Sequence, residues 1–275
     1  MRLLRILPAL ALLAAPSATT LVAQGGAAGA GGLAAHVAIG DSLFDALKPA
    51  DALRHYEAAL AVDSTNYGAN WKAARAIADV AKQILEDDDA SEGRRDSLYN
   101  VGRAYAERAV RADSTDAWGH YALAMVLGRL SLTKGSKERV RFAKIIFDEA
   151  SRALQIDSVH AGAHHVLGAW HANVKRLSGI QRFFARMLFG GGFLSQGNWP
   201  DAQRHLERAV TLRPGYIYSR LELARVYADI GRYTAAREQL TTIARLPDSD
   251  VLDHEYRREA AELLQEIQNK TDRTS

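Results

Sequence analysis

The sequence contains no cysteine, and this absence excludes several kinds of chemistry. No disulfide can form, no thiol can act as a nucleophile, and no lipid can be attached through a cysteine side chain. Proline is also scarce, with 6 residues among 275. Proline is the strongest helix breaker, whereas the abundant alanine, leucine, arginine and glutamate are good helix formers. The composition therefore favours helix almost throughout, and no segment has a convincing strand pattern.

The sequence also has little net charge and no long apolar run. Its formal charge is +3, and two of its basic residues, Arg2 and Arg5, lie at the very start of the chain. This balance gives no indication of nucleic-acid binding. No segment approaches the ~20 uninterrupted apolar residues of a transmembrane helix, so we do not expect an integral membrane protein. The hydrophobic content of 48% is enough to bury a substantial core.

Residues 1–23 have the three parts of a secretory signal peptide. Arg2 and Arg5 come first, an apolar stretch follows, and small residues lead up to Ala23. We therefore expect cleavage near Ala23 and a periplasmic or secreted protein. The alternative is a mitochondrial transit peptide, because acidic residues are absent, or a cytoplasmic location. The glycine- and alanine-rich residues 24–32 read as a flexible linker.

A repeated pattern of small and bulky residues begins after this linker. In the first unit, Leu33 to Asn66, Gly40 and Ala52 are small where two helices would cross closely. Tyr56 would fill the gap between neighbouring helix hairpins. This combination is typical of tetratricopeptide repeats, in which helix hairpins stack into a solenoid.

Similar helix endings recur along the chain, with alanine at one equivalent position in four units: Ala59, Ala109, Ala153 and Ala209. The units are longer than the usual ~34 residues, which indicates insertions. These fall at 86–93, 133–138 and 178–198. An amphipathic segment, Leu252 to Gln268, is typical of a terminal cap. We predict an all-α, tetratricopeptide-like, right-handed helical solenoid over 33–269, with about five hairpins, a capping helix and a disordered tail at 270–275.

Four stretches resemble one known family, the regulator of microtubule dynamics family. They are ANWKAARAI at 69–77, LTKGSKERVRFAKIIFDEASRALQID at 132–157, HHVLGAWH at 164–171 and IQRFFARMLFG at 180–190. The resemblance covers roughly residues 66–268. It implies a tetratricopeptide-like fold, no enzymatic activity and, in eukaryotic members, an association with microtubules and mitochondria. The chain departs from the family at Gly190–Gly192, where a proline-containing linker is expected.

The first helix of each hairpin should line the concave side of the solenoid. We count each unit from Leu33, Tyr67, Ala117, Ala161 and Ile217, so that the second, fifth, ninth and thirteenth positions face the groove. These positions include the predicted partner-binding residues Trp71, Arg75, Trp118, Tyr121, Arg129, His165, Asn173, Tyr218, Arg225 and Asp229.

This set combines aromatic rings with guanidinium groups. Rings give apolar contact at small entropic cost, and arginine grips carboxylates with two hydrogen bonds. We therefore expect a protein or peptide partner that is acidic or that presents its C-terminal carboxylate. The alternative, above all for Trp71 and Trp118, is packing between helices.

Histidine and glycine clusters raise two other possibilities. His160 and His164 have the i, i+4 spacing of a metal site, but no carboxylate follows at a third ligand spacing, so we expect no metal. Gly190–Gly192 lacks the preceding strand and following lysine of a phosphate loop, so it reads as a joint. No GxSxG or HExxH motif occurs. We predict no cofactor and no enzyme, although carboxylates from distant parts of the chain can still meet in space.

Two functional hypotheses follow. The first is an exported, non-enzymatic adaptor that binds its partner in the concave groove. The second is a scaffold on the cytoskeleton or on a membrane surface, acting through a basic amphipathic helix. The segment from Ile180 to Phe189 is such a helix, with Ile180, Phe183, Phe184, Met187, Leu188 and Phe189 on one side. Because it is short, we expect it to dock on the fourth repeat in preference to lipid.

Overall fold

The computed structural model describes residues 18–273, and the side chains of these residues except those of 18–30 and of positions 182, 184, 186, 188 and 189. Within this range the chain forms α-helices and two short 3-10 helices, with no strand, as the composition predicts.

No described helix is long and apolar enough to cross a membrane. The elements are α1 (Ala18–Asp45), α2 (Pro49–Val62), α3 (Tyr67–Ala81), α4 (Asp89–Ala112), α5 (Ala117–Leu130), η1 (Ser131–Thr133), α6 (Ser136–Ile156), α7 (Ala161–Arg176), α8 (Gly179–Phe189), η2 (Gly191–Gln196), α9 (Trp199–Leu212), α10 (Ile217–Asp229), α11 (Tyr233–Ile243) and α12 (Asp253–Ile267).

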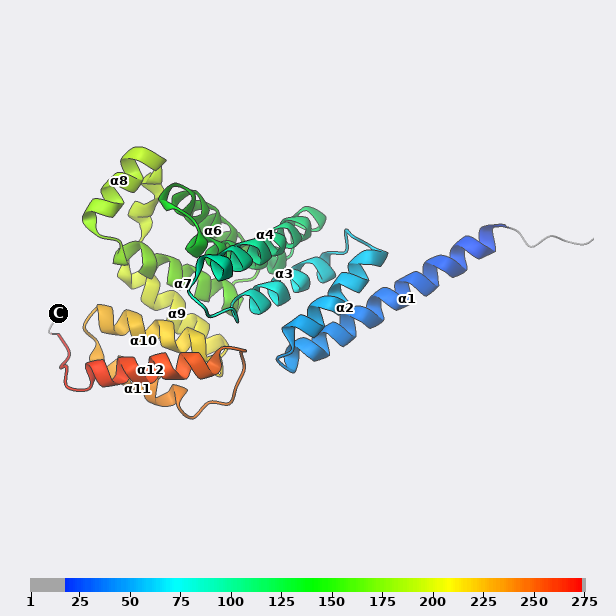
Figure 1. Ribbon diagram of the computed structural model, residues 1–275. Coiled ribbons are helices and arrows are strands. Elements are labelled where there is room, and N and C mark those ends of the chain that lie inside the picture. Colours follow the sequence, from blue (N-terminus) through cyan, green and yellow to red (C-terminus); the bar gives the residue numbers. More distant parts are fainter. Residues whose placement is uncertain (1–17, 274–275) are drawn as a thin grey trace, which may run out of the picture.

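The helices pack as five hairpins, α1–α2, α3–α4, α5–α6, α7–α9 and α10–α11, followed by α12. The hairpins stack along the molecule, with α1 projecting beyond α2 at one end (Figure 1). The first helices of neighbouring hairpins pack on one another, whereas their second helices meet less closely. The stack is therefore curved, with the first helices on its concave side. The predicted solenoid of about five hairpins is confirmed.

Repeated turn chemistry sets the starts of the helices. The carboxylates of Asp63 and Asp113 each accept the backbone N–H and the hydroxyl of the threonine two residues later. The next helix then begins with a capping side chain, Asn66 before α3 and Asp116 before α5. Such short polar side chains satisfy the backbone groups that a helix end leaves unpaired. Four first helices accordingly begin at the residues predicted from the sequence, Tyr67, Ala117, Ala161 and Ile217.

Small residues allow the helices to cross closely. A Cβ atom on Gly40 would lie 2.5 Å from the Tyr56 ring, and one on Gly168 would lie 2.5 Å from the Leu206 side chain. Tyr56 thus packs within the first hairpin, where its hydroxyl donates to Asp41 at 2.9 Å. Tyr56 also belongs to the same buried cluster as Ala69 and Ala73 of α3, which agrees with its predicted place towards the next hairpin. The tight α1–α2 crossing at Gly40 gives the ring its space.

All three insertions lie between the two helices of a hairpin, so they leave the stacking of hairpins intact. The largest contains α8 and η2, between α7 and α9. The prediction that α8 docks on the fourth repeat is wrong: it packs mainly on α6 of the third hairpin and on η2. Ala185 is buried, but Ile180, Phe183 and Met187 are 71%, 58% and 69% exposed. The reason is that α8 contacts only α6 and η2 closely, so that just one side of it is covered.

Two segments expected to be unstructured are ordered. Residues 24–32 continue α1, because alanine favours helix strongly enough to carry several glycines at about 1 kcal/mol each. Residues 270–273 lie against the start of α11. There Asp272 accepts the N–H of Thr234 at 2.8 Å, and Arg273 N–H donates to the Gly231 carbonyl at 3.0 Å. Asp272 supplies the cap that α11 lacks locally. The predicted signal peptide lies mostly outside the described residues.

Candidate partner-binding surface

The ten predicted groove residues lie on α3, α5, α7 and α10, which are first helices of their hairpins. An aromatic cluster occupies the α3–α5 part of this surface. The rings of Trp71 and Trp118 stack with centroids 4.7 Å apart, and Tyr121 meets Trp118 edge-on at 5.9 Å. Trp118 is 38% exposed, so the cluster is open to solvent on one side. The structure thus brings the predicted aromatic residues together at the surface.

Arg75 lies at the centre of this aromatic cluster. Its guanidinium carbon is 4.0 Å from the ring centroid of Phe44, 5.6 Å from that of Trp71 and 6.0 Å from that of Trp118. Rings of this kind hold a guanidinium group in place through cation–π attraction. Among the described residues, none forms a hydrogen bond or an ion pair with Arg75. Its donors are therefore positioned by the rings and left for another acceptor.

The other two predicted arginines are engaged with the chain itself. Arg129 lies over the Tyr218 ring at 5.1 Å and donates to the Tyr256 hydroxyl at 3.5 Å. Arg225 forms ion pairs with Glu222 and Glu259. We expected all three arginines to bind a carboxylate of the partner. At two of these three positions, side chains of α10 and α12 already interact with the guanidinium group and would compete with the partner.

The remaining predicted residues lie on the same part of the surface as Arg129 and Arg225, and they too interact with other side chains of the chain. Asp229 forms an ion pair with Arg176 at 2.9 Å, and the Asn173 amide oxygen accepts from Arg176 at 3.3 Å. His165 bonds to the Ser219 hydroxyl at 3.0 Å, and its ring lies 4.9 Å from Tyr218. Burial lowers the pKa of His165 to about 4, so the imidazole is neutral at pH 7.

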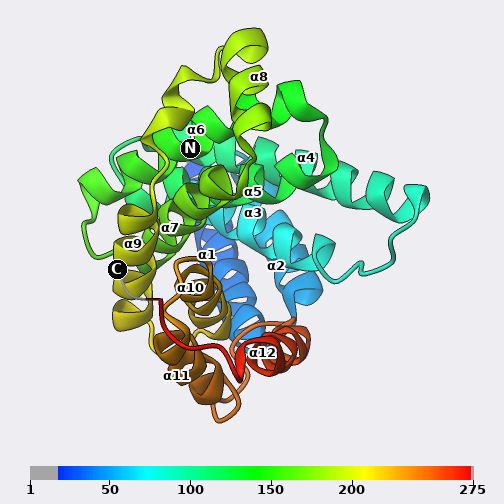
Figure 2. The same cartoon turned by 90° about the vertical axis from the view of Figure 1, so that its left-hand side faces the viewer.

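The C-terminal segment explains why Arg129 and Arg225 already have partners within the chain while Arg75 does not. The loop before α12 and α12 itself fold back onto the inner surface, and Figure 2 shows α12 beside α10. Lys82, at the end of α3, pairs with Asp79 and Asp250 at 2.7 Å each, and its side chain is 6% exposed. Tyr256 of α12 stacks on Tyr218 at 4.5 Å. The predicted cap is thus also an inner wall of the groove.

The acidic partners of Lys82 respond differently to its charge. Burial acts to raise the pKa of Asp250, but Lys82 and the N–H of Leu252 together hold that pKa below its usual value. Burial raises the pKa of Asp79, and the charge of Asp250 adds to this effect against that of Lys82. One ammonium group cannot offset two buried carboxylates equally. Asp250, which also accepts from the Tyr216 hydroxyl at 3.2 Å, is the better stabilised anion.

A cavity of about 220 Å³ lies between the first hairpin, α3 and the C-terminal loop. Arg75 and Arg213 both line it. Arg213 lies over the Tyr216 ring at 4.5 Å, and no described residue forms an ion pair with it. Four acidic residues line the cavity: Asp79 and Asp250 pair with Lys82, Asp248 pairs with Arg257, and Asp45 forms no ion pair with a described residue. Arg75 and Arg213 thus line the cavity without an ion pair to any described residue, and Asp45 is the one acidic residue of its lining that is not paired with another cation.

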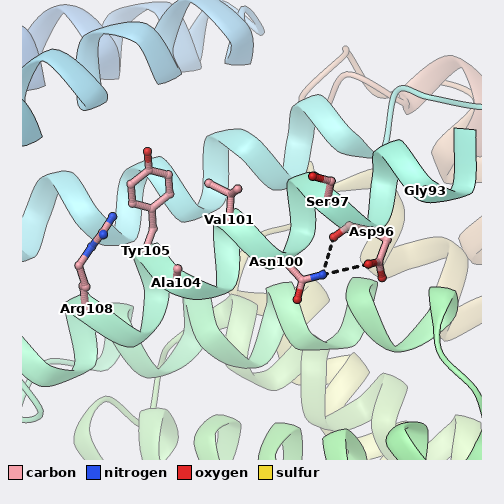
Figure 3. Close-up of a pocket in the computed structure, with 8 residues that line it drawn as sticks. All are labelled: Gly93, Asp96, Ser97, Asn100, Val101, Ala104, Tyr105 and Arg108. Atoms are coloured by element: carbon pink, nitrogen blue, oxygen red, sulfur yellow. Dashed lines mark hydrogen bonds between the residues drawn. The ribbon is translucent and has the colours of Figure 1, made fainter. Parts of the chain in front are cut away.

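A second pocket, open and of about 640 Å³, runs along α4 from Gly93 to Arg108 (Figure 3). Its lining mixes polar and apolar side chains, and the Asn100 amide donates to the Asp96 carbonyl and carboxylate at 2.8 and 3.0 Å. Because α4 is a second helix, this pocket lies away from the predicted groove. Its arginine, Arg108, lies over the Tyr105 ring at 4.7 Å but donates to the Asn70 amide oxygen at 3.0 Å, so unlike Arg75 it has a hydrogen-bond partner.

Sequence reasoning missed a set of polar pairs inside the hairpins. The fourth residue of each unit, counted from Leu33, Tyr67, Ala117, Ala161 and Ile217, bonds to the second helix of the same hairpin. The pairs are His36 with His55, Asn70 with Arg108, His120 with Glu149, His164 with His205, and Arg220 with Gln239. Four of these side chains also bond to the backbone carbonyl six residues earlier, in the preceding turn. A comparison of equivalent positions in the counted units would have found them.

These pairs explain the histidine cluster as structure. His164 Nδ1 lies 2.9 Å from His205 Nδ1, whereas His160 caps α7 by accepting the Ala163 N–H. Burial lowers the pKa of His164, and it lowers that of His205 to about 4 with help from Arg204. Across the described part of the chain, no three acidic or histidine side chains are grouped as a metal site would require.

The family model described as regulator of microtubule dynamics protein 1-3 matches residues 37–268. The chain belongs to this family. The match includes the region that carries the resemblance in the sequence and extends it into the first hairpin.

Regulator of microtubule dynamics protein 3 of Rattus norvegicus is 24% identical over 194 residues, which cover 70% of this chain and 40% of the rat protein. Regulator of microtubule dynamics protein 1 of Bos taurus is 26% identical over 202 residues, which cover 73% of this chain and 62% of the bovine protein. The chain thus spans less than two thirds of these relatives.

Among solved structures, a thermophilic TPR protein of Thermus thermophilus is similar. The TM-score is 0.58 at 18% identity, over 85% of this chain and 99% of that one. This likeness confirms the tetratricopeptide-type fold.

Proposed function

We propose that this protein is a non-enzymatic adaptor that binds a peptide or protein partner on the concave surface at α3 and α5. The observation that carries the proposal is Arg75, whose guanidinium group is fixed by three aromatic rings while no described residue forms a hydrogen bond or an ion pair with it. A structural arginine is rarely left in this state, because burial without a partner is costly. Arg129 and Arg225, on the same surface, by contrast have hydrogen-bond or ion-pair partners within the chain.

The chemistry of this half of the surface favours a carboxylate beside an apolar group. The Trp71–Trp118 stack offers a rigid apolar platform, and Arg75 and Arg213 offer donors suited to a carboxylate. The cavity of about 220 Å³ has room for a side chain or a chain terminus and is too small for a folded segment. A short peptide that ends in a carboxylate, with an apolar residue near it, fits this description.

The experiment is a binding screen against a peptide array in which every sequence is present with a free and with an amidated C-terminus. We expect selected peptides to need the free carboxylate and to lose binding in Arg75→Glu. Arg111→Glu is the matched control, because Arg111 is exposed on α4 and has no ion pair within the described part of the chain. Equal binding by the Arg75→Glu variant, or indifference to amidation, would show that this surface does not select a carboxylate.

The names of the relatives give a second candidate, an association with microtubules. Family membership supports it, but the relatives contain long regions that this chain does not match. Co-sedimentation with polymerised tubulin tests it directly. Pelleting that survives Arg75→Glu would assign microtubule binding to another surface, and no pelleting would remove this candidate.

We further propose that the protein is exported and acts outside the cytoplasm. The support is the order of basic, apolar and small residues in 1–23. Export suits a chain without cysteine, because its fold then depends on packing and hydrogen bonds in any redox environment.

A further inference from the structure

The helix α8 exposes an apolar stripe to solvent. Ile180, Phe183 and Met187 are 71%, 58% and 69% exposed, and their i, i+3, i+7 spacing places them on one side of the helix. Ala185, on the other side, is buried. Large apolar side chains of this kind are normally covered unless they contact something outside the chain. We propose that α8 docks the protein onto an anionic lipid surface.

The structure holds this stripe outward. The start of α8 is fixed by a capping box, in which the Ser178 hydroxyl accepts the Gln181 N–H at 3.1 Å and the Gln181 side chain accepts the Ser178 N–H at 2.8 Å. Its end is fixed by Gly190 in the left-handed conformation, with φ of +68°. Gly191 then packs so closely that an added Cβ would lie 2.8 Å from the Ala185 carbonyl oxygen. In both overall views α8 lies at the outer edge of the molecule (Figures 1 and 2).

Charge selects an anionic surface. The sequence contains no Asp or Glu from Ser158 to Pro200, and this stretch includes Lys175, Arg182 and Arg186 besides Arg176, which is paired with Asp229. Acidic residues on the neighbouring α6 are already paired, Glu138 with Arg141 and Asp148 with Lys144. A short helix with apolar residues on one face and basic residues beside it binds at the boundary between headgroups and acyl chains of anionic lipid.

The size of the stripe argues against a protein partner. A helix of 11 residues is about 16 Å long, and one face of it covers roughly 200 Å². A stable interface between proteins buries about 800 Å² on each partner. Interfacial lipid binding needs only that the apolar face enters about 5–10 Å into the surface. The exposed area of α8 therefore suits lipid better than a second copy of this chain.

The absence of cysteine makes a site-specific test clean. Met187→Cys is labelled with an environment-sensitive fluorophore (NBD) and mixed with vesicles of phosphatidylglycerol and phosphatidylcholine or of phosphatidylcholine alone. The control is Val62→Cys, because Val62 is 53% exposed at the end of α2, far from α8 in Figure 1. The full chain is used for both, so any contribution of residues 1–23 is the same.

We expect a several-fold rise and a blue shift of the emission at position 187 with the anionic vesicles only, weakened by salt. Position 62 should not respond, and adding Phe183→Glu should abolish the response at 187 without changing the circular dichroism spectrum. No response at 187, an equal response at 62, or an equal response to neutral vesicles overturns the proposal. A concentration-dependent response without vesicles would show that α8 joins copies of this chain, and it too overturns the proposal.

Discussion

The buried ion pair of Lys82 links α3 to the loop before α12, so Lys82→Met should loosen the C-terminal segment from the inner surface. The Lys82 and Asp250 side chains are both 6% exposed, and Asp79 is a second carboxylate beside them. Methionine keeps much of the length of lysine but removes its charge and its donors. Two buried carboxylates would then face each other without a cation.

Breaking a buried pair in this way costs about 3–5 kcal/mol. For a chain of this size each kcal/mol lowers the melting temperature by roughly 2–4 °C, so we expect a fall of about 6–20 °C. The matched control is Lys144→Met, which makes the same change in an exposed pair whose side chains are 60% and 54% accessible. Exposed pairs one helical turn apart contribute about 0.5 kcal/mol or less, so this control should melt within about 2 °C of the wild type.

Thermal melting followed by circular dichroism compares the two variants. A triple variant, Lys82→Met with Asp79→Asn and Asp250→Asn, should recover much of the loss, because it removes all the buried charge together. Equal melting temperatures for Lys82→Met and Lys144→Met would refute the role given to this ion pair. Failure of the triple variant to recover would show that Lys82 acts through packing and not through charge.

Three further predictions concern the hairpins and the leader. Gly168→Ala should destabilise the fold by about 1–3 kcal/mol, because its Cβ would lie 2.5 Å from the Leu206 side chain, whereas Gly128→Ala, with nothing within 4 Å, should stabilise it by up to about 1 kcal/mol in urea unfolding. The pKa of His205 falls to about 4 in the fold against ~6.5 unfolded. Its stabilising contribution is therefore complete above pH 6.5 and is lost as the pH falls towards 4. Urea midpoints between pH 7.5 and 4.5 should fall less steeply in His205→Gln, and parallel curves would contradict this. N-terminal sequencing of the exported protein should find a start just after Ala23, and an intact Met1 in the cytosol would contradict export.

Sequence reasoning succeeded where structure depends on neighbouring residues. The starts of α3, α5 and α7 follow from short polar turns that repeat with their capping side chains, whereas α10 begins after Pro214 and Gly215 without a side-chain cap. Gly40 and Ala52 mark a helix crossing, because a Cβ on Gly40 would collide with Tyr56 and Ala52 is fully buried. Both signals lie within a few positions of the feature they specify, so they can be read without knowledge of the fold.

Sequence reasoning failed where a residue's interaction partner lies far away in the sequence. The ion pair between Lys82 and Asp250 joins residues 168 positions apart, and no local pattern announces it. The engagement of Arg225 by Glu259 depends on the same return of α12 to the inner surface. The spacing of the groove residues was therefore enough to assign them to one surface. It could not show which of them interact with other residues of the chain and which are left to bind a partner. That division left Arg75 as the central residue of the candidate site.

The most direct test of the adaptor account is photo-crosslinking from two similarly exposed positions on different helix layers. Trp118 on α5 is 38% exposed, and Val101 on α4 is 43% exposed. Each is replaced by benzoylphenylalanine, and the protein is irradiated with a peptide selected by the array. The account predicts a covalent adduct from position 118, suppressed by Arg75→Glu, and none from position 101. An adduct from position 101 alone, or equal adducts from both, would contradict partner binding on the concave surface.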